Sequence, residues 1–207
     1  TVDFVADIQF RSDVTVELVR SSAHDSDVLF AARVSTQGEQ TLEESMNTPE
    51  SQEENLKRDK GLINYLMRDR HGSPFEHNSM TFYVQAPIFV FREFMRHRIA
   101  SYNEESARYR ELNPVFYVPA DDRNLVQQGK PGAYEFVPGT PEQIKLTQEA
   151  TKKAVTVAYE EYERMLQAGV AREVARGVLP VATYSSMYVT MNARSLMNFL
   201  SLRTKRE

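Results

Sequence analysis

Alternating hydrophobic and polar residues predict three strands along the chain. Val14, Val16 and Leu18 are separated by polar residues, and this period of two is typical of a half-buried strand. Residues 80–86 repeat the alternation and are followed by a proline, which stops a strand because it lacks an amide hydrogen. Residues 186–191 form the third predicted strand.

Helical spacing predicts three helices in the first half of the chain. Asp25 is the expected N-cap of a short helix, because its carboxylate can accept from the free amides of the first turn. Apolar residues at i, i+1, i+4 and i+5 within residues 62–67 predict a second helix, which ends before His71. A third helix is expected over residues 88–97.

The second half of the chain carries clearer helix boundaries. Thr140 and Gln143 form a capping box with a proline in the first turn, and Gly169 ends the helix of about 27 residues that follows. Its apolar side is read as core or subunit contact. A short helix is expected over residues 171–178, and Asn192 is the expected cap of the last helix.

Two segments lack periodicity. Residues 36–54 are rich in Glu, Gln, Ser and Thr, so a surface loop leading into a helix is predicted there. Residues 111–139 hold several Pro and Gly and are predicted to be an irregular connection over the surface.

Length and composition indicate one cytoplasmic domain. The chain has 207 residues, 41% of them hydrophobic, and a formal net charge of -4. This acidic balance disfavours a general nucleic-acid binder, and neither a membrane span nor a secretory signal is recognisable. Cysteine is absent, which excludes disulfides, zinc thiolate sites and cysteine nucleophiles. The four histidines lack metal-ligand spacing, so no metal site is expected.

Residues 96–109 are the most informative part of the chain, because they combine guanidinium, hydroxyl and carboxylate groups with little aliphatic content. From Arg92 to Arg110 there are five Arg and no Lys, and the planar fork of Arg suits bidentate binding of phosphate. This pattern favours an anion site. The alternative is a solvated, charge-laced helix end in which Arg and Glu merely pair with one another.

These residues resemble the signature of the flavin-dependent thymidylate synthases. The pattern is R-H-R-x-x-S-x-N-E-x-S-x-R-Y, and every specified position is filled between Arg96 and Tyr109. Further segments resemble the same family in the expected order, and they are residues 31–35, 71–77, 172–176 and 192–200.

The resemblance implies an α+β fold with a small, mostly antiparallel sheet flanked by helices, in one domain over residues 1–207. It also implies a homotetramer whose active sites are shared between subunits. The implied reaction is the reductive methylation of dUMP to dTMP with 5,10-methylenetetrahydrofolate and NADPH, through FAD. No nucleic-acid or membrane partner is expected.

The resemblance also assigns roles to residues. The implied FAD contacts are Ser73, Arg96, His97, Arg98, Glu104, Asn192, Arg194 and Asn198. The implied dUMP contacts are Glu93, Arg96, Glu104, Glu105, Ser106, Ala107, Arg108, Arg176 and Arg203, with Arg176 reaching in from a neighbouring subunit. Ser106 has no Ser-His-Asp arrangement to activate it, which favours binding over nucleophilic catalysis.

Arg203 is the implied catalytic residue. A fixed cation beside N3 of the uracil lowers the pKa of that nitrogen and enriches C5 with electrons. Because the chain has no cysteine to add at C6 of the base, a mechanism in which reduced flavin delivers hydride fits the residues present.

Two features depart from the family pattern. Glu93 stands where these enzymes usually carry Gln, and its carboxylate would repel a dianionic nucleotide unless Arg92 or Arg96 neutralised it. The C-terminal end also looks short, four residues beyond Arg203. The alternatives are therefore a catalytically weak homologue that binds FAD or nucleotide, and an RNA-binding protein that uses the Arg-rich segment.

Overall fold

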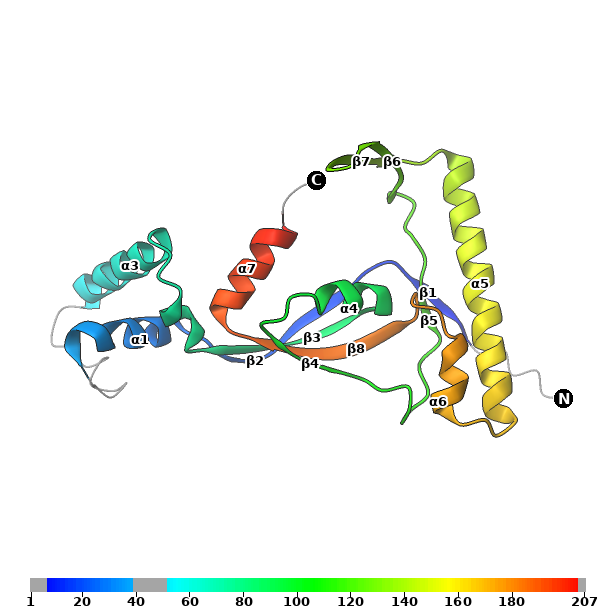
Figure 1. The fold of residues 1–207 in the computed structure, drawn as a ribbon, viewed down its shortest axis with the longest axis horizontal. Helices are drawn as coiled ribbons and strands as arrows, with labels where there is room; N and C mark the ends of the chain where they lie inside the picture. Colours follow the sequence, from blue (N-terminus) through cyan, green and yellow to red (C-terminus); the bar gives the residue numbers. More distant parts are fainter. Residues whose placement is uncertain (1–6, 39–51, 205–207) are drawn as a thin grey trace.

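An antiparallel four-stranded sheet forms the centre of the molecule (Figure 1). The structure is a computed structural model and describes residues 7–38 and 52–204. The strand order is β2-β3-β8-β4, with bounds β2 Thr15–Ser22, β3 Ser79–Pro87, β8 Tyr184–Met191 and β4 Ser101–Glu104. All three predicted strands are thus present, and the expected α+β fold with a small antiparallel sheet is confirmed.

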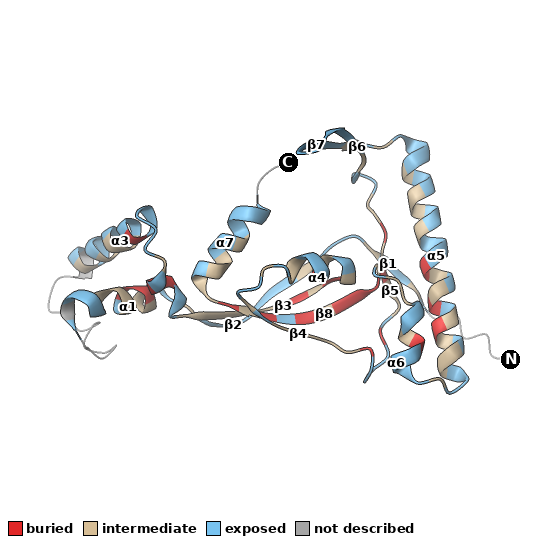
Figure 2. Ribbon diagram, in the orientation of Figure 1, coloured by how far each residue is buried: buried red, intermediate tan, exposed pale blue. Residues whose placement is uncertain are grey.

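One face of this sheet is covered by α4, Ile88–Phe94. Alternate residues of β3 and β8 point to that face, as the sequence period requires, and Val84 and Met187 are paired across the two strands and buried. Phe91 of α4 is 1% exposed and packs onto them. Figure 2 shows the buried positions concentrated on β3 and β8 and on one side of α5.

The outer strand β2 is less covered than its sequence predicts. Val16 and Leu18 pair with Val84 and Phe82 of β3, yet they are 59% and 57% exposed, because α4 does not reach across β2. The strand is present as predicted, but its apolar side is not half-buried within one chain.

Helices occupy both ends of the sheet (Figure 1). At one end lie α1 (Asp25–Gln37), α3 (Gln52–Arg68) and the 3-10 turn η1 (Ser73–Glu76), which share a small core. At the other end the long helix α5 (Pro141–Gln167) packs against α6 (Arg172–Ala175) and η2 (Arg176–Val178). The last helix, α7 (Ala193–Arg203), contacts η1.

Several predicted helix boundaries are confirmed by cap geometry. Thr140 accepts from the amide of Gln143 at 3.3 Å and α5 has the expected 27 residues. Asn192 caps α7 by accepting from the amide of Ser195 at 2.9 Å. The helix that was predicted to end before His71 ends at Arg68.

Two other helix boundaries were wrong. The N-cap of α1 is His24, whose amide donates to the carboxylate of Asp27 at 2.7 Å, whereas Asp25 is the first helical residue. The helix expected over residues 88–97 ends at Phe94, because the chain turns at residues 95–97 to reach β4.

The irregular connection predicted over residues 111–139 was also wrong. It contains β5 (Val115–Tyr117), which pairs in parallel with β1 (Gln9–Arg11), a strand too short for its period to be recognised. It also contains the hairpin β6 (Asn124–Lys130) and β7 (Ala133–Pro138). Pro131-Gly132 was the missed signal, since a turn with Pro before a Gly of positive φ (86°) connects the two strands.

Most of the predicted loop at residues 36–54 lies outside the described residues, and the described ends of that range belong to α1 and α3. No helix within residues 7–38 and 52–204 is both long and apolar enough to cross a membrane.

Tyr184 ties β8 to the chain just before β2. Its hydroxyl donates to the main-chain oxygen of Asp13 at 2.8 Å, and the guanidinium of Arg11 lies 4.9 Å from its ring centroid. Burial raises the pKa of Tyr184 to about 12. The protonated side chain is therefore the form that the folded state requires.

We predict that Tyr184→Phe makes alkaline unfolding less steep. The pKa of tyrosine in the unfolded chain is about 10, so the stabilisation linked to Tyr184 is intact below pH 10 and is lost as the pH rises towards 12. Urea unfolding between pH 8 and 11 measures this loss. An unfolding free energy that falls equally fast in both proteins would contradict the assignment.

Candidate active site

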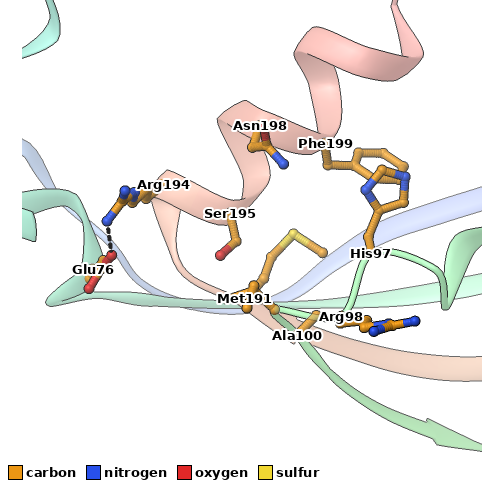
Figure 3. A pocket seen from close by; sticks show the side chains of 10 residues that line it. Glu76, His97, Arg98, Ala100, Met191, Arg194, Ser195, Asn198 and Phe199 are labelled. Atoms are coloured by element: carbon orange, nitrogen blue, oxygen red, sulfur yellow. Dashed lines mark hydrogen bonds and ion pairs between the residues drawn. The ribbon is translucent and has the colours of Figure 1, made fainter. Parts of the chain in front are cut away.

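Two cavities lie at the two ends of β4. The first, which we call the α7 cavity, has a volume of about 450 Å³ and is lined by Glu76, His97, Arg98, Ile99, Ala100, Met191, Arg194, Ser195, Asn198 and Phe199 (Figure 3). The second, the α6 cavity, has a volume of about 300 Å³ and is lined by Ile88, Glu104, Glu105, Ser106, Ala107, Leu112, Arg176, Leu179 and Ser185.

The first turns of α7 present the polar wall of the α7 cavity. Because Asn192 caps the helix, Arg194 and Asn198 fall one turn apart on the same face, as their spacing predicted, and both line the cavity (Figure 3). Arg194 forms an ion pair with Glu76 of η1 across the opening. The N-terminal end of a helix adds a partial positive charge, so this wall favours an anionic group.

Gly72 makes room for Arg194. A Cβ atom at Gly72 would lie 2.7 Å from Nε and 2.8 Å from Cζ of Arg194, which is closer than real Cβ contacts. The guanidinium therefore lies directly against the backbone before η1. A residue other than glycine at this position would push the side chain of Arg194 away.

The opposite wall is the turn that carries Arg96, His97 and Arg98. The imidazole of His97 contacts Phe199 of α7 at a centroid distance of 4.8 Å, and its Nε2 accepts a hydrogen bond from Nε of Arg203 at 3.0 Å. Nε2 is therefore the unprotonated ring nitrogen in this arrangement. Arg203 thus belongs to the α7 side of the site, although it does not line the cavity itself.

β4 separates the two cavities by a fixed length. No strand was predicted over this segment, but Ser101 to Glu104 pair with Thr190 to Met187 of β8. Ala100 lines the α7 cavity and Glu104 lines the α6 cavity, and four extended residues span about 13 Å. The two halves of the signature therefore open into different cavities of one chain.

The α6 cavity gathers groups that suit a phosphate. Ser106, Ala107 at the start of a turn and Arg176 line it, and their hydroxyl, amide and guanidinium groups are donors to phosphate oxygens, while Glu104 and Glu105 line the same cavity with acidic side chains. Arg176, which was expected to reach in from a neighbouring subunit, lines this cavity together with Glu104 and Ser106 of its own chain.

Two ion pairs agree in part with the alternative expectation, in which Arg and Glu side chains merely pair with one another. Arg108 lies 3.2 Å from Glu173, and Arg110 lies 3.5 Å from Glu105. The side chains of both arginines are about half exposed, at 48% and 58%. Exposed pairs of this kind contribute only about 0–1 kcal/mol, so an anionic ligand can displace them at small cost.

The predicted site residues therefore fall into three groups. Those in the α7 cavity are His97, Arg98, Arg194 and Asn198, and those in the α6 cavity are Glu104, Glu105, Ser106, Ala107 and Arg176. Those that line neither cavity are Ser73, Glu93, Arg96, Arg108, Asn192 and Arg203. Glu93 lies exposed on α4, and Ser73 lies exposed at the start of η1.

Sequence reasoning missed six lining residues of the α7 cavity, and they are Glu76, Ile99, Ala100, Met191, Ser195 and Phe199. Glu76 stands inside the segment 71–77, where an acid near an arginine-rich site was a usable signal. The spacing of the other five does not mark them as site residues. Within the described part of the chain, no three His, Asp or Glu side chains are grouped to hold a metal ion.

Comparison with known proteins identifies the class to which this fold and these cavities belong. A family model described as "Thymidylate synthase complementing protein" matches residues 17–207. The flavin-dependent thymidylate synthase of Streptomyces coelicolor is 69% identical over 201 residues, which cover 97% of this chain and 79% of that protein. That of Tropheryma whipplei strain TW08/27 is 60% identical over 204 residues, covering 98% and 81%.

A solved structure agrees with these matches. The UMP/dUMP methylase PolB from Streptomyces cacaoi, bound with 5-Br dUMP, has a TM-score of 0.84 and 56% identity, over 96% of this chain and 82% of that one. The chain belongs to the flavin-dependent thymidylate synthase family.

We predict that Gly72→Ala weakens binding in the α7 cavity without unfolding the protein. The three atoms nearest to the new methyl group all belong to the outer part of the Arg194 side chain, so the melting temperature stays within about 2 °C while FAD affinity falls about tenfold or more. Fluorescence titration with FAD measures the affinity. Gly61→Ala is the matched control, since nothing lies within 4 Å of its new Cβ, and equal FAD binding by both variants would contradict the role of Gly72.

Proposed function

We propose that the protein converts dUMP to dTMP with 5,10-methylenetetrahydrofolate as the carbon donor and NADPH as the reductant, through bound FAD. The observation that carries this proposal is the placement of the signature residues in two cavities at the two ends of one short strand, with Arg98 and Arg194 in one and Ser106 and Arg176 in the other. The family membership supports the same reaction. It also disfavours the RNA-binding and weak-homologue alternatives.

The residues of the α7 cavity fit FAD. Its guanidinium, amide and hydroxyl donors, together with the N-terminus of α7, suit a pyrophosphate, and Gly72 gives the side chain of Arg194 room to lie at this cavity. Arg98, Arg194 and Asn198 are the residues proposed to hold FAD, and His97 lines the same cavity. When bound, the flavin would supply the hydride-transfer chemistry that connects NADPH with the one-carbon unit.

The residues of the α6 cavity fit the nucleotide. Ser106, the backbone at Ala107 and Arg176 are proposed to bind the phosphate of dUMP, with Arg108 released from Glu173 to join them. Glu93 does not line this cavity and is exposed on α4, where solvent and salt screen the repulsion expected from its carboxylate. The solved relative PolB binds 5-Br dUMP, which is consistent with a uridine nucleotide as the ligand.

Arg203 is proposed to activate the base. In the net reaction a methyl group replaces the hydrogen on C5 of uracil, the methylene carbon comes from the folate, and NADPH supplies the hydride. A guanidinium beside N3 favours the anionic ring, which raises electron density at C5 without any nucleophile adding at C6. No cysteine exists in the chain to act as that nucleophile.

The site is proposed to be completed between subunits of a homotetramer. Arg203 is bonded to His97 on the α7 side, whereas Ser106 lies in the α6 cavity, about 13 Å further along β4. The proposal that another copy supplies the Arg203 facing the base follows the shared active sites that the family resemblance implies. The exposed apolar strip of Val16 and Leu18 is a surface that a second copy can cover. A cytoplasmic location and the lack of nucleic-acid or membrane partners stay predictions from composition.

We predict that Arg203→Ala lowers kcat for dTMP formation by about 100-fold to 1000-fold, as expected when one fixed charge-stabilising donor is lost. The melting temperature stays unchanged because Arg203 is exposed at the end of α7. dUMP-dependent oxidation of NADPH, with dTMP identified by chromatography, measures the rate. Arg164→Ala is the control, since that arginine is 76% exposed on α5.

Retention of kcat in Arg203→Ala would remove the proposed role of Arg203. Flavin binding by the unmodified protein without dTMP formation would instead support the weak-homologue alternative.

A further inference from the structure

Tyr102 occupies an unspecified position of the signature, between Ser101 and Asn103, and the family resemblance assigns it no role. It lies in β4, paired with Val189 of β8, and its ring packs with the core beneath α4. Since Val189 is fully buried, this is the covered face of the sheet. The side chain therefore points under the turn that carries Arg96, His97 and Arg98.

The hydroxyl of Tyr102 holds that turn by its main chain. It donates a short hydrogen bond to the carbonyl oxygen of His97 and lies 3.3 Å from that of Phe94. The amide of His97 also donates to the oxygen of Phe94, at 3.0 Å. These carbonyls follow the last turn of α4, where the helix no longer supplies donors, so the tyrosine hydroxyl acts as their cap.

The ring of Tyr102 is linked to α7 through a chain of aromatic contacts. It meets Phe94 edge-on at 6.1 Å, and Phe94 stacks on Phe199 at 4.6 Å. Phe199 in turn contacts His97, whose Nε2 accepts from Arg203. One side chain of β4 thus supports both walls of the α7 cavity.

Tyr102 also lies in the same strand as a residue of the α6 cavity. Glu104, two residues further along β4, lines the α6 cavity, and Met187 of β8 fixes its register. Burial raises the pKa of Tyr102, so the hydroxyl stays protonated and remains a donor at neutral pH.

We propose that Tyr102 is a positioning residue that holds the Arg96-His97-Arg98 turn on β4 and so sets the shape of the α7 cavity relative to the α6 cavity. The inference rests on the proposed function for its ligand, FAD, but the restraint on the turn is a property of the protein alone. Tyr102 does not line either cavity, and it acts through the main chain of His97.

The test is Tyr102→Phe, which keeps the ring and removes only the hydroxyl. We expect amide hydrogen exchange at residues 95–97, whose amides are hydrogen-bonded within this turn, to become about fivefold to tenfold faster without any ligand, while exchange in β8 is unchanged, as for loss of one hydrogen bond. FAD is expected to bind about fivefold to tenfold more weakly for the same reason, with KM for dUMP changed less than about twofold. Tyr184→Phe is the matched control, because it also loses a hydroxyl bond to a main-chain carbonyl, that of Asp13.

Unchanged exchange at residues 95–97 in Tyr102→Phe would overturn the inference, whatever the activity. Faster exchange with FAD affinity equal to that of the unmodified protein would also overturn it, because the turn would then not shape the ligand site. If the unmodified protein binds no FAD and forms no dTMP, the proposed function fails, and the exchange measurement alone decides the role of Tyr102.

Discussion

The pairing of β4 with β8 is the constraint on which the site depends. Four residues, Ser101 to Glu104, are hydrogen-bonded in register to Thr190 to Met187, and that register determines where each half of the signature ends. The arginine turn is brought against α7, and the Ser106 turn is brought against Arg176. A slip of one residue would reverse the faces of Tyr102 and Glu104, and would separate the turn from its support.

Local packing and hydrogen bonds, and not strong attraction between charges, determine where the charged side chains of the site lie. Most arginines of the site are exposed or paired with carboxylates at the surface, where ion pairs stabilise the fold little. Backbone space at Gly72, the Asn192 cap and the His97 contact determine where the guanidinium groups of Arg194 and Arg203 lie. Ligand binding can therefore exchange weak protein pairs for stronger charge-assisted bonds to phosphate.

Local patterns predicted the elements but not all of the assembly of the site. Strand alternation found the sheet, cap residues found α5 and α7, and i, i+4 spacing placed Arg194 and Asn198 on one face. The resemblance supplied the residue roles, which spacing alone does not reveal. β4 was missed because most of its residues are polar, so it lacks the alternating pattern from which strands were predicted. Glu76 and Phe199 line the α7 cavity only because tertiary packing brings them there, and the periodicity of a sequence does not predict such contacts.

The account requires that the α7 cavity of one subunit works with the α6 cavity of another. Mixing Arg194→Ala with Arg176→Ala in one assembly tests this most directly, because each variant damages a different cavity. Each alone is expected to be nearly inactive, and an equal mixture is expected to regain about a quarter of the activity, since random assortment leaves that share of sites intact. Mixed assemblies, verified by native mass spectrometry, that recover no dTMP formation would contradict the shared site.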